Sequence, residues 1–532
     1  MAKVLIIGLD GATWRVLEPW ARDGRLPNLA VLMARGSWGP LRSTVPALTL
    51  PAWSSLATGR NPGGHGVFAF RRLRPDRYDS PGLASASDLR APTLWEIAGR
   101  AGVRVGVVNV PPSYPIRPVN GFVVSCLLTP PGEPFAAPPE VAGELDGYRI
   151  DVQPPRGVVL DDPVNRAQAL AYLEAIAQLT RGRTRATLHL ARSRPTDLLA
   201  VVFYAPDRVQ HCFWTYVDGE AVPDPDVAAA VAAVYAALDE AVGDLVRAAG
   251  PDATVALVSD HGFGPKPVHA VHLNRWLADR GFLRQRPLWT VRRKIIRKLL
   301  PGRLRGQLDT LDHILVDRAR SRAWAETLEP GTAAIWIHVA DRYPQGCVAS
   351  GREYESVRDE VATGLRALRG PDGEPVFAAV HRRETVYRGP YVPEAPDLVA
   401  VCEPRYGVVY HSLRRDLGQR ALFTVFREEG FSGAHDATGI YLFAGPHVQP
   451  LGRHREYPIE SIAPTALHLL GVPIPRNMDA PPCTSVLDPD YLQRAPVQFT
   501  DDVAETAASP GWRSPEDEAL VAARLQALGY LE

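Results

Sequence analysis

Cysteine is scarce in this chain, and its spacing fits no known framework. The 532 residues include five cysteines, an odd number without any CxxC pair: Cys126, Cys212, Cys347, Cys402 and Cys483. This spacing indicates neither a disulfide scaffold nor a thiolate zinc knuckle, and it fits a reducing compartment best. We therefore expect a cytoplasmic protein.

Long apolar runs are missing as well. The longest, residues 227–238, is too short and too rich in alanine to span a bilayer, and acidic residues flank it. The amino-terminal residues read as a core strand and lack the small-residue cleavage site of a secretory signal. We expect a soluble chain that is at most peripheral to a membrane.

Charge of neither sign is in excess. Lys plus Arg equals Asp plus Glu at 59 each, so bulk charge does not favour specific nucleic-acid binding. One stretch departs from this balance, because residues 284–305 carry nine basic side chains and no acid. Three interpretations of this basic segment stay open: a solvated helix face, a cap over an anionic substrate, or a contact with an anionic membrane or lipid.

Apolar runs that are short and rich in Val, Ile and Leu alternate with segments of helical period. This alternation is typical of strands that crossover helices bury on both faces. The expected strands are residues 3–9, 103–110, 121–126, 197–204, 253–259, 334–339, 397–402 and 439–445. The expected helices are residues 93–101, 164–192, 225–249, 354–368 and 462–470, with a terminal helix after a Ser-Pro start near residue 514. The pattern predicts an α/β protein with a mostly parallel central sheet flanked by helices.

Acidic residues stand at the ends of three expected strands. Asp10 ends the first, Asp207 follows the strand at 197–204, and Asp260 and His261 follow the strand at 253–259. His211 lies one helical turn after Asp207, on the same face. The ligand crevice of an open α/β sheet lies at the carboxyl ends of its strands, so these side chains could converge. A single Asp there is most often a helix cap, but three such ends with histidine partners favour a metal site for zinc, manganese or iron.

Thr49 is the candidate nucleophile. It precedes Leu50 and Pro51, and proline suits the first turn of a helix. Thr49 would then lie at a helix amino terminus, where free N–H groups and the macrodipole favour an anion. An ordinary N-cap threonine is the alternative, and it would be preferred if the metal ligands were absent.

Together these segments resemble the type I phosphodiesterase/nucleotide pyrophosphatase family of the alkaline phosphatase superfamily. The motifs that carry the resemblance are GLDGATW, LTLPAWSSLATGRNPGGHGVF, PDRVQHCFW, SDHGFGP, GAHDATGIYLFAGP and SIAPTALHLLGVPIPRNMD. The resemblance implies an alkaline phosphatase-like fold with an inserted cap. We expect the catalytic core at residues 1–280 and 391–485, the cap with the basic segment at 281–390, and an extension with the terminal helix at 486–532.

The resemblance also implies two divalent metal ions, with zinc as the first choice and manganese or iron as alternatives. The ligands of one ion would be Asp207, His211 and His435. The ligands of the other would be Asp10, Asp260, His261 and the hydroxyl of Thr49. His435 is assigned from the resemblance alone, because a lone loop histidine is more often a surface residue. His65, in the same set of motifs, is expected to position the loop after the nucleophile helix.

The implied activity is metal-dependent hydrolysis of phosphate esters through a phospho-threonine. A divalent cation lowers the pKa of the Thr49 hydroxyl and fixes it for attack on phosphorus. Well-known nucleotide pyrophosphatases carry an Asn after the nucleophile, and no such Asn is evident here. No Arg is evident beside Thr49 that could bind a dianionic phosphate monoester. We therefore expect phosphodiesters to be the preferred substrates.

Other activities remain open at this point. The main alternative is a phosphotransferase that moves a phosphoryl-linked head group to a lipid or glycan acceptor, because it would use the same nucleophile and metals. A phosphomonoesterase, a sulfatase and a non-catalytic binding protein rank lower. The sequence does not predict an oligomeric state.

Overall fold

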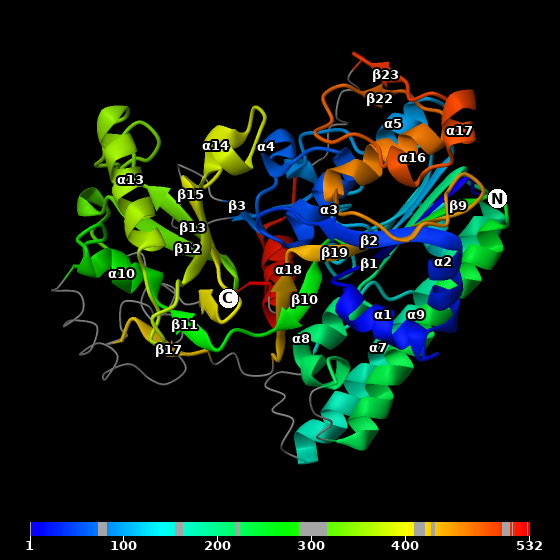
Figure 1. Cartoon of the computed structure of the whole chain (residues 1–532), viewed down its shortest axis with the longest axis horizontal. Coiled ribbons are helices and arrows are strands. Elements are labelled where there is room, and N and C mark those ends of the chain that lie inside the picture. Colours follow the sequence, from blue (N-terminus) through cyan, green and yellow to red (C-terminus); the bar gives the residue numbers. More distant parts are fainter. Residues whose placement is uncertain are drawn as a thin grey trace.

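The computed structural model describes residues 2–72, 82–154, 163–219, 224–286, 316–408, 421–426, 431–502, 511–512, 514–528 and 530–531. Two lobes are visible in Figure 1: a larger one around a central sheet and a smaller one that carries β12, β13 and β15. Most of the basic segment, residues 287–305, lies outside the described residues. Within the described part of the chain, no helix is both long enough and apolar enough to cross a membrane.

The central sheet has ten strands in the order β20-β2-β19-β9-β1-β8-β5-β6-β7, with β21 beside β2. Its parallel centre consists of β9 (Thr254–Val258), β1 (Val4–Leu9), β8 (Leu198–Phe203), β5 (Val105–Val108) and β6 (Gly121–Val124). The flanking strands are β2 (Gly36–Arg42), β7 (Ala136–Ala137), β19 (Thr438–Ala444), β20 (Gly452–Arg453) and β21 (Tyr457–Pro458). Strand β19 pairs antiparallel with β2 and β9, and β7 pairs antiparallel with β6. The predicted α/β class with a mostly parallel sheet is confirmed.

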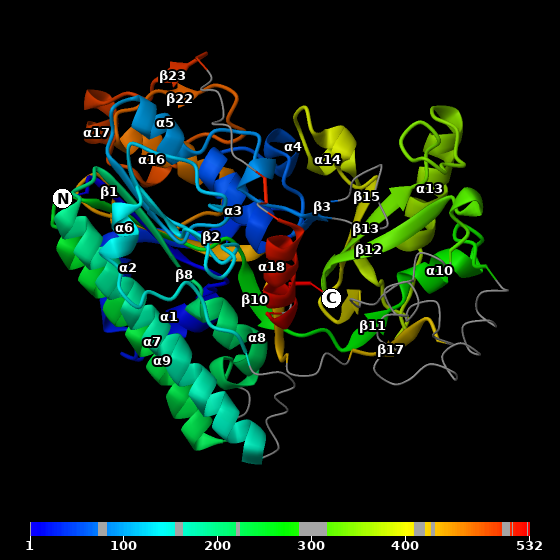
Figure 2. The ribbon, with the colours of Figure 1, turned by 180° about the vertical axis from the view of Figure 1, so that it is seen from behind.

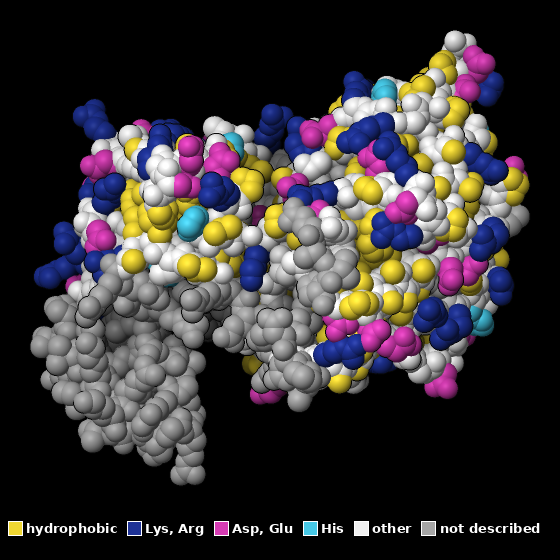
Figure 3. Space-filling model, turned by 60° about the horizontal axis from the view of Figure 1, so that its bottom comes forward, with side chains coloured by type: hydrophobic (Ala, Val, Ile, Leu, Met, Phe, Trp, Pro, Cys, Tyr) yellow, Lys and Arg dark blue, Asp and Glu magenta, His cyan; other side chains and the backbone are white. Residues whose placement is uncertain are grey.

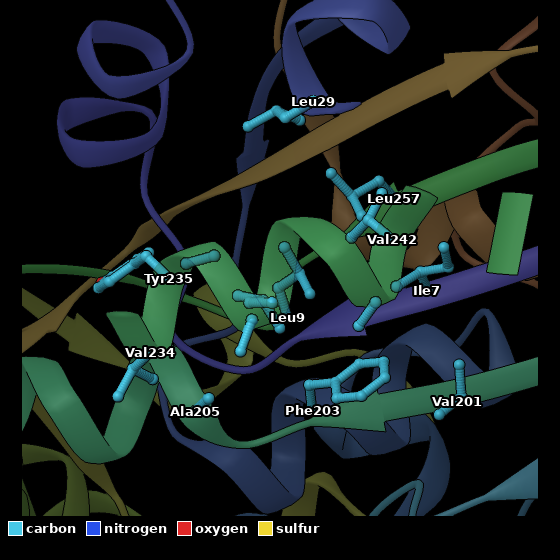
Figure 4. Packing of buried hydrophobic residues seen from close by; sticks show 14 of the residues in the cluster. Ile7, Leu9, Leu29, Val201, Phe203, Ala205, Val234, Tyr235, Val242 and Leu257 are labelled. Carbon is cyan, nitrogen blue, oxygen red and sulfur yellow. The ribbon is translucent and has the colours of Figure 1, made fainter. Parts of the chain in front are cut away.

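Both faces of this sheet are covered, as the apolar runs require. Along β1, Leu5, Ile7 and Leu9 point to one buried cluster, whereas Val4 and Ile6 point to the other, because side chains alternate along a strand. The first face, shown in Figure 4, is covered by α1 (Trp14–Arg22), α2 (Pro27–Arg35), α7 (Pro163–Ser193), α8 (Ala205–Val217) and α9 (Pro225–Ala249). The second face is covered by α3 (Thr49–Thr58), α5 (Leu94–Arg100), α16 (Ile462–Leu469) and α18 (Pro515–Ala527).

The smaller lobe has its own antiparallel sheet. Its strands, in order, are β12 (Ala323–Glu329), β13 (Thr332–Ile337), β15 (Leu398–Cys402) and β14 (Phe377–Arg382). The expected strands at 334–339 and 397–402 are therefore real but lie outside the parallel sheet. Two helices, α10 (Leu273–Asp279) and α13 (Arg352–Arg366), pack against this lobe, whose apolar core draws on residues 271–408. The division of the chain into four segments stays a prediction.

Short elements complete the fold. A three-stranded sheet beside the smaller lobe consists of β16 (Tyr406–Val408), β11 (His269–Val271) and β17 (Phe423–Val425). A two-stranded pair consists of β10 (Gly262–Pro265) and β18 (Gly433–Asp436). The remaining short pieces are β3 (Arg71–Arg72), β4 (Gly82–Leu83), β22 (Ile474–Pro475), β23 (Phe499–Thr500), α4 (Pro62–His65), α6 (Glu140–Gly143), α14 (Arg383–Val386) and α17 (Pro489–Arg494).

The terminal helix α18 forms where the Ser-Pro start predicts it. The Ser514 hydroxyl accepts the N–H of Asp517 at 3.1 Å, and Pro515 occupies the first turn. Its buried side, Val521 and Leu525, joins the core on the second face of the sheet. Figure 2 shows α18 between the larger and the smaller lobe.

Hydrogen bonds fasten the smaller lobe to the helix layer that begins with α3. The Tyr387 hydroxyl donates to the carbonyl of Val45 at 2.7 Å. The side chain of Asn61 donates to the carbonyl of Arg388 and accepts its N–H, each at 2.9 Å. The smaller lobe therefore contacts the chain on both sides of α3, close to Thr49.

Candidate active site

Three neighbouring parallel strands deliver the candidate carboxylates to one edge of the central sheet. Strands β9, β1 and β8 are adjacent and in register. Asp10 follows β1, Asp260 follows β9, and Asp207 lies in the first turn of α8, which begins directly after β8. All three acids are fully buried. The convergence that the strand ends predict is therefore present.

The first candidate metal group consists of Asp207, His211 and His435. Asp207 and His211 lie one turn apart on α8, with 3.4 Å between Oδ1 and Nε2. The short ladder of β10 and β18 pairs Phe263 with His435 and carries that histidine to the same place. His435 Nε2 is 3.1 Å from His211 Nε2 and 3.5 Å from Asp207 Oδ1. These atoms face a common point.

The second candidate group consists of Asp10, Asp260 and His261, with Thr49 beside it. His261 Nε2 lies 3.3 Å from Asp260 Oδ2 and 3.8 Å from Asp10 Oδ1. Thr49 is the first residue of α3 and is fully buried, and its Oγ1 is 3.5 Å from His261 Nε2. Leu48 occupies the N-cap position, so the ordinary N-cap alternative for Thr49 is wrong, and its hydroxyl lies beside His261 of the second group.

The acids of the second group each use one oxygen for the protein and leave the other unpaired. Asp10 Oδ2 accepts the indole N–H of Trp53 at 3.0 Å, and Asp260 Oδ1 accepts the N–H of Gly11 at 3.1 Å. The oxygens that face His261, Asp10 Oδ1 and Asp260 Oδ2, are buried without a hydrogen-bond partner among the described residues. A buried unpaired carboxylate oxygen is costly, and a cation would compensate it.

Asp207 of the first group also uses one carboxylate oxygen for hydrogen bonds to the protein and leaves the other unpaired. Its Oδ2 accepts from the Arg208 guanidinium at 2.6 Å and from the Tyr530 hydroxyl at 2.7 Å. Its Oδ1, which faces His211 and His435, has no hydrogen-bond partner in the described part of the chain. Three buried acids thus present one free oxygen each toward histidine nitrogens, and this donor set fits two divalent cations of the zinc type.

The pKa values of the three acids also indicate that the two groups bind cations. Burial, together with the nearby charge of Asp207, raises the pKa of Asp10 to about 8. Burial and the charge of Asp10 raise the pKa of Asp260 well above its ordinary value. Burial opposes ionisation of Asp207 too, but His211 and His435 hold its pKa well below the usual range. Without cations the three acids therefore do not ionise together near neutral pH, and bound cations would allow all three to do so.

His65 is the last residue of the short helix α4, which follows α3, and it does not belong to either group. It is buried, its Nε2 is 3.0 Å from Ser55 Oγ, and its Nδ1 accepts the N–H of Val67 at 3.1 Å. These bonds tie α4 and the loop that follows it to α3, as expected for the predicted positioning role.

Several residues around the groups were not predicted from the sequence. Trp53, one turn after Thr49 on α3, and Arg208, next to Asp207, could have been found from their place beside predicted residues. Tyr530 and Glu329 carry no local signal. Glu329 ends β12 of the smaller lobe, is buried, and places Oε2 3.5 Å from His435 Nδ1, which is also 3.0 Å from the carbonyl of Ala47.

A cavity of about 1060 Å³ between the lobes reaches this region. Its walls include His435, Ala47 and Phe263 on the side of the larger lobe, and Glu329 and Tyr406 on the other side. The cavity therefore connects solvent with the edge of the first metal group.

The chain is similar to known proteins in sequence pattern and in fold. Residues 4–437 match the family model of type I phosphodiesterase/nucleotide pyrophosphatase. Phosphonoacetate hydrolase from Sinorhizobium meliloti 1021, solved with phosphonoacetate, is similar over 88% of this chain and 95% of its own, with a TM-score of 0.52 and 16% identity. Murine ectonucleotide pyrophosphatase/phosphodiesterase 5, solved as an inactive variant with AMP, is similar over 92% and 100%, with a TM-score of 0.50 and 14% identity.

At these identities the two structures show a shared, alkaline phosphatase-like fold. No curated protein sequence matches the chain. The family model, in contrast, spans most of the sequence and includes every residue of both candidate metal groups. The chain therefore belongs to the type I phosphodiesterase/nucleotide pyrophosphatase family and is a phosphoric ester hydrolase.

Proposed function

We propose that the chain hydrolyses phosphodiesters through a covalent phospho-threonine at Thr49, with two divalent cations held by the two groups of acids and histidines. The observation that carries this proposal is the set of free, buried carboxylate oxygens on Asp10, Asp207 and Asp260, which lie beside the histidines of the two groups. The Thr49 hydroxyl lies 3.5 Å from His261 Nε2 of the second group. Zinc suits the mixed donor set best, and manganese and iron are the alternatives.

When bound, the two cations would lower the pKa of the Thr49 hydroxyl and neutralise charge on the phosphate oxygens. Thr49 Oγ1 forms a bond to phosphorus while the bond from phosphorus to the leaving alcohol breaks, and that alcohol departs with a proton. Water then attacks the phospho-threonine, the monoester leaves, and the Thr49 hydroxyl is restored. The positive end of the α3 dipole lies at Thr49 and favours the phosphoryl charge throughout.

A diester is the better substrate because, among the described residues, the guanidinium that contacts a ligand of the metal groups is already occupied by other bonds. Arg208 contacts Asp207, but its other nitrogen is bound to Asp151 at 2.7 Å, and the whole side chain is buried. Arg208 is therefore unavailable to clamp the second charge of a monoester dianion. In this proposal the free N–H groups at the start of α3 take the role of the Asn that the sequence lacks after Thr49.

Transfer of the phosphoryl-linked group to an alcohol of a lipid or glycan is the second candidate. The cavity beside His435 supports it, since its volume of about 1060 Å³ leaves room for a large acceptor. Hydrolysis and transfer share the phospho-threonine and differ only in what attacks it. Product analysis with and without added alcohols distinguishes them: a phosphorylated alcohol at the expense of the monoester indicates transfer.

The nucleophile is tested by Thr49→Ala, with Thr58→Ala as the matched control on the same helix. The Thr58 hydroxyl is also buried, but it donates to the carbonyl of Ser54. We expect Thr49→Ala to lose at least about a thousandfold in kcat on an aryl phosphodiester, on the scale of removing a covalent nucleophile. Its metal content should stay close to that of the wild type, because the threonine is one donor among several.

Thr58→Ala should keep nearly full activity, and Thr49→Ser should keep part of it. A panel of diester, monoester and sulfate ester substrates with defined zinc, manganese or iron completes the test. Wild-type turnover by Thr49→Ala would rule out the covalent route, and a preference for sulfate esters would rule out the proposed substrate class.

A further inference from the structure

Asp207 is held from behind by two residues that are far apart in the sequence. The guanidinium of Arg208 is buried between two acids, with Nη1 2.6 Å from Asp207 Oδ2 and Nη2 2.7 Å from Asp151 Oδ2. The hydroxyl of Tyr530 lies 2.9 Å from Arg208 Nη1 and 2.7 Å from Asp207 Oδ2. These groups form one closed network behind the candidate metal ligand.

The directions of these hydrogen bonds are fixed by chemistry. A guanidinium has only donors, so the Tyr530 oxygen accepts from Arg208. The proton of the Tyr530 hydroxyl is then free for Asp207 Oδ2, which receives two donors. Only Asp207 Oδ1 remains for a cation, and it lies 3.4 Å from His211 Nε2 and 3.5 Å from His435 Nε2. The network therefore decides which oxygen of Asp207 enters the metal group.

Packing fixes the place of the Tyr530 hydroxyl independently of any metal. The ring of Tyr530 is 3% exposed and stacks on Phe70 at 4.7 Å between ring centroids. Leu528 and Leu531, its neighbours after α18, are buried in the same apolar cluster. The ring also lies 6.1 Å from that of His211 and 6.3 Å from that of His435. Tyr530 thus forms a wall of the metal group as well as a partner of its acid.

We propose that Tyr530 is a positioning residue for Asp207, so that the segment after α18 completes the metal group of Asp207, His211 and His435. This inference rests on the proposed function, because it assigns a role within the same two-cation site. Hydrogen-bond partners of metal ligands affect metal affinity by about 10-fold to 100-fold. Tyr530 shares the task with Arg208, so we expect an effect near the lower end of that range.

The test is Tyr530→Phe, which removes the hydroxyl and keeps the ring on Phe70. The matched control is Tyr441→Phe in β19, whose buried hydroxyl donates to the carbonyl of Arg455 at 2.7 Å. Zinc affinity is measured by competition with a chelator, and cobalt absorption spectra report the ligand geometry. We expect Tyr530→Phe to bind one of two zinc ions about tenfold more weakly and to change the spectrum of that site alone. The Tm values of the two metal-free variants should be similar.

The outcomes separate this inference from the function on which it rests. If the wild-type chain binds two ions and Tyr530→Phe binds both with unchanged affinity, Tyr530 only packs and the inference is wrong. Equal weakening of both ions, with a metal-free Tm well below that of Tyr441→Phe, indicates a general structural role and also overturns it. A wild-type chain that binds no divalent metal overturns the proposed function together with the inference.

Discussion

Asp10 illustrates how a single buried side chain couples the metal site to the stability of the fold. Its carboxyl has an ordinary pKa of 3.8, and burial raises that pKa to about 8 in the metal-free protein. A raised carboxyl pKa means that the folded state prefers the protonated form. The stability that this preference gives is present at low pH and is lost as the pH rises through the folded-state pKa. The pKa of Asp260 is raised for the same reason.

The histidines fix the pH window in which this effect can be measured. Burial lowers the pKa of His211 and His261 below 6.5. In the folded chain both are neutral above that pH, and in the unfolded chain they lose the rest of their protons within about one pH unit. Although burial opposes it, Asp207 and Glu329 raise the pKa of His435 to about 10, so His435 also loses its stabilising contribution as the pH rises. Between pH 6.5 and 8 the losses at Asp10, Asp260 and His435 therefore outweigh the small remaining gain from His211 and His261.

We therefore predict that the Tm of the metal-free protein falls between pH 6.5 and 8, whereas the Tm with two divalent ions bound changes little. The physical reason is that bound cations favour the ionised acids. Thermal unfolding at several pH values, with chelator or with zinc, measures the difference. Asp10→Asn should reduce the pH dependence of the metal-free Tm. A metal-free Tm that rises over this range would contradict the prediction.

At the scale of elements, the site depends on the close approach of β1 and α3. Gly8 in β1 faces Trp53 of α3, and a Cβ at this position would lie 2.4 Å from the Trp53 ring and 2.8 Å from Val202 Cγ2. The same Trp53 donates to Asp10. The glycine therefore sets the distance between the strand that carries one metal ligand and the helix that carries the nucleophile.

We predict that Gly8→Ala lowers the free energy of unfolding by about 1–3 kcal/mol, the usual cost of overpacking a core. It should also weaken metal binding, because Trp53 must move away from Asp10. Denaturant unfolding and a zinc titration measure the two effects. The control is Gly143→Ala in α6, where an added Cβ meets no atom within 4 Å. Equal behaviour of the two variants would show that Trp53 has room to shift.

The sequence predicted most of the long strands, but it did not predict to which sheet each strand belongs. The parallel strands at the centre of the sheet and the acids at their ends were predicted, because burial on both faces produces apolar runs and parallel strands end at one edge. Strand β2 was not predicted. The runs at 334–339 and 397–402 are equally apolar, since the smaller sheet buries β13 fully as well. A fully buried strand gives the same apolar run in a parallel and in an antiparallel sheet. The sequence could therefore not predict that these two strands belong to a second, antiparallel sheet.

Long-range contacts were the other limit. His435 lies on a four-residue strand without a periodic pattern, and only the family resemblance pointed to it. Tyr530 reaches Asp207 across 323 residues of sequence, and Glu329 reaches His435 from the other lobe. No local pattern encodes these contacts, because they arise only when the two lobes and the segment after α18 pack together.

At the scale of the whole molecule, the site lies where the lobes meet, and one segment of the sequence departs from the even balance of charge. Over the described surface in Figure 3, basic and acidic side chains are interspersed. The basic segment differs, with nine basic residues between 284 and 305 and no acid. The described residues on either side of the gap at 287–315 are Arg286 and Val316, and Gln285 forms a bridge with Val316, which belongs to the core of the smaller lobe. We propose that this segment contacts a phosphate-rich surface, either a large anionic substrate or an anionic membrane.

The prediction for this segment uses a variant with five glutamines in place of Arg292, Arg293, Lys294, Arg297 and Lys298. Each basic residue near an anionic membrane contributes about 1 kcal/mol, so binding to vesicles that contain phosphatidylserine should weaken by well over tenfold. The salt dependence of binding should also decrease, because fewer charges are screened. Hydrolysis of a small aryl diester should stay near the wild-type rate, since the metal groups are untouched. Vesicle co-sedimentation and steady-state kinetics measure these effects.

The matched control changes the net charge equally but at dispersed positions of the larger lobe. It replaces five exposed arginines with glutamine, one on each of five helices: Arg35, Arg100, Arg192, Arg247 and Arg494. If the contact depends on the local cluster, this control keeps vesicle binding while the segment variant loses it. Weaker turnover of a large anionic substrate by the segment variant, with unchanged vesicle binding, would assign the segment to substrate capture. If the segment variant matches the wild type in both assays, the basic residues form a solvated face, and both the membrane and the substrate roles are wrong.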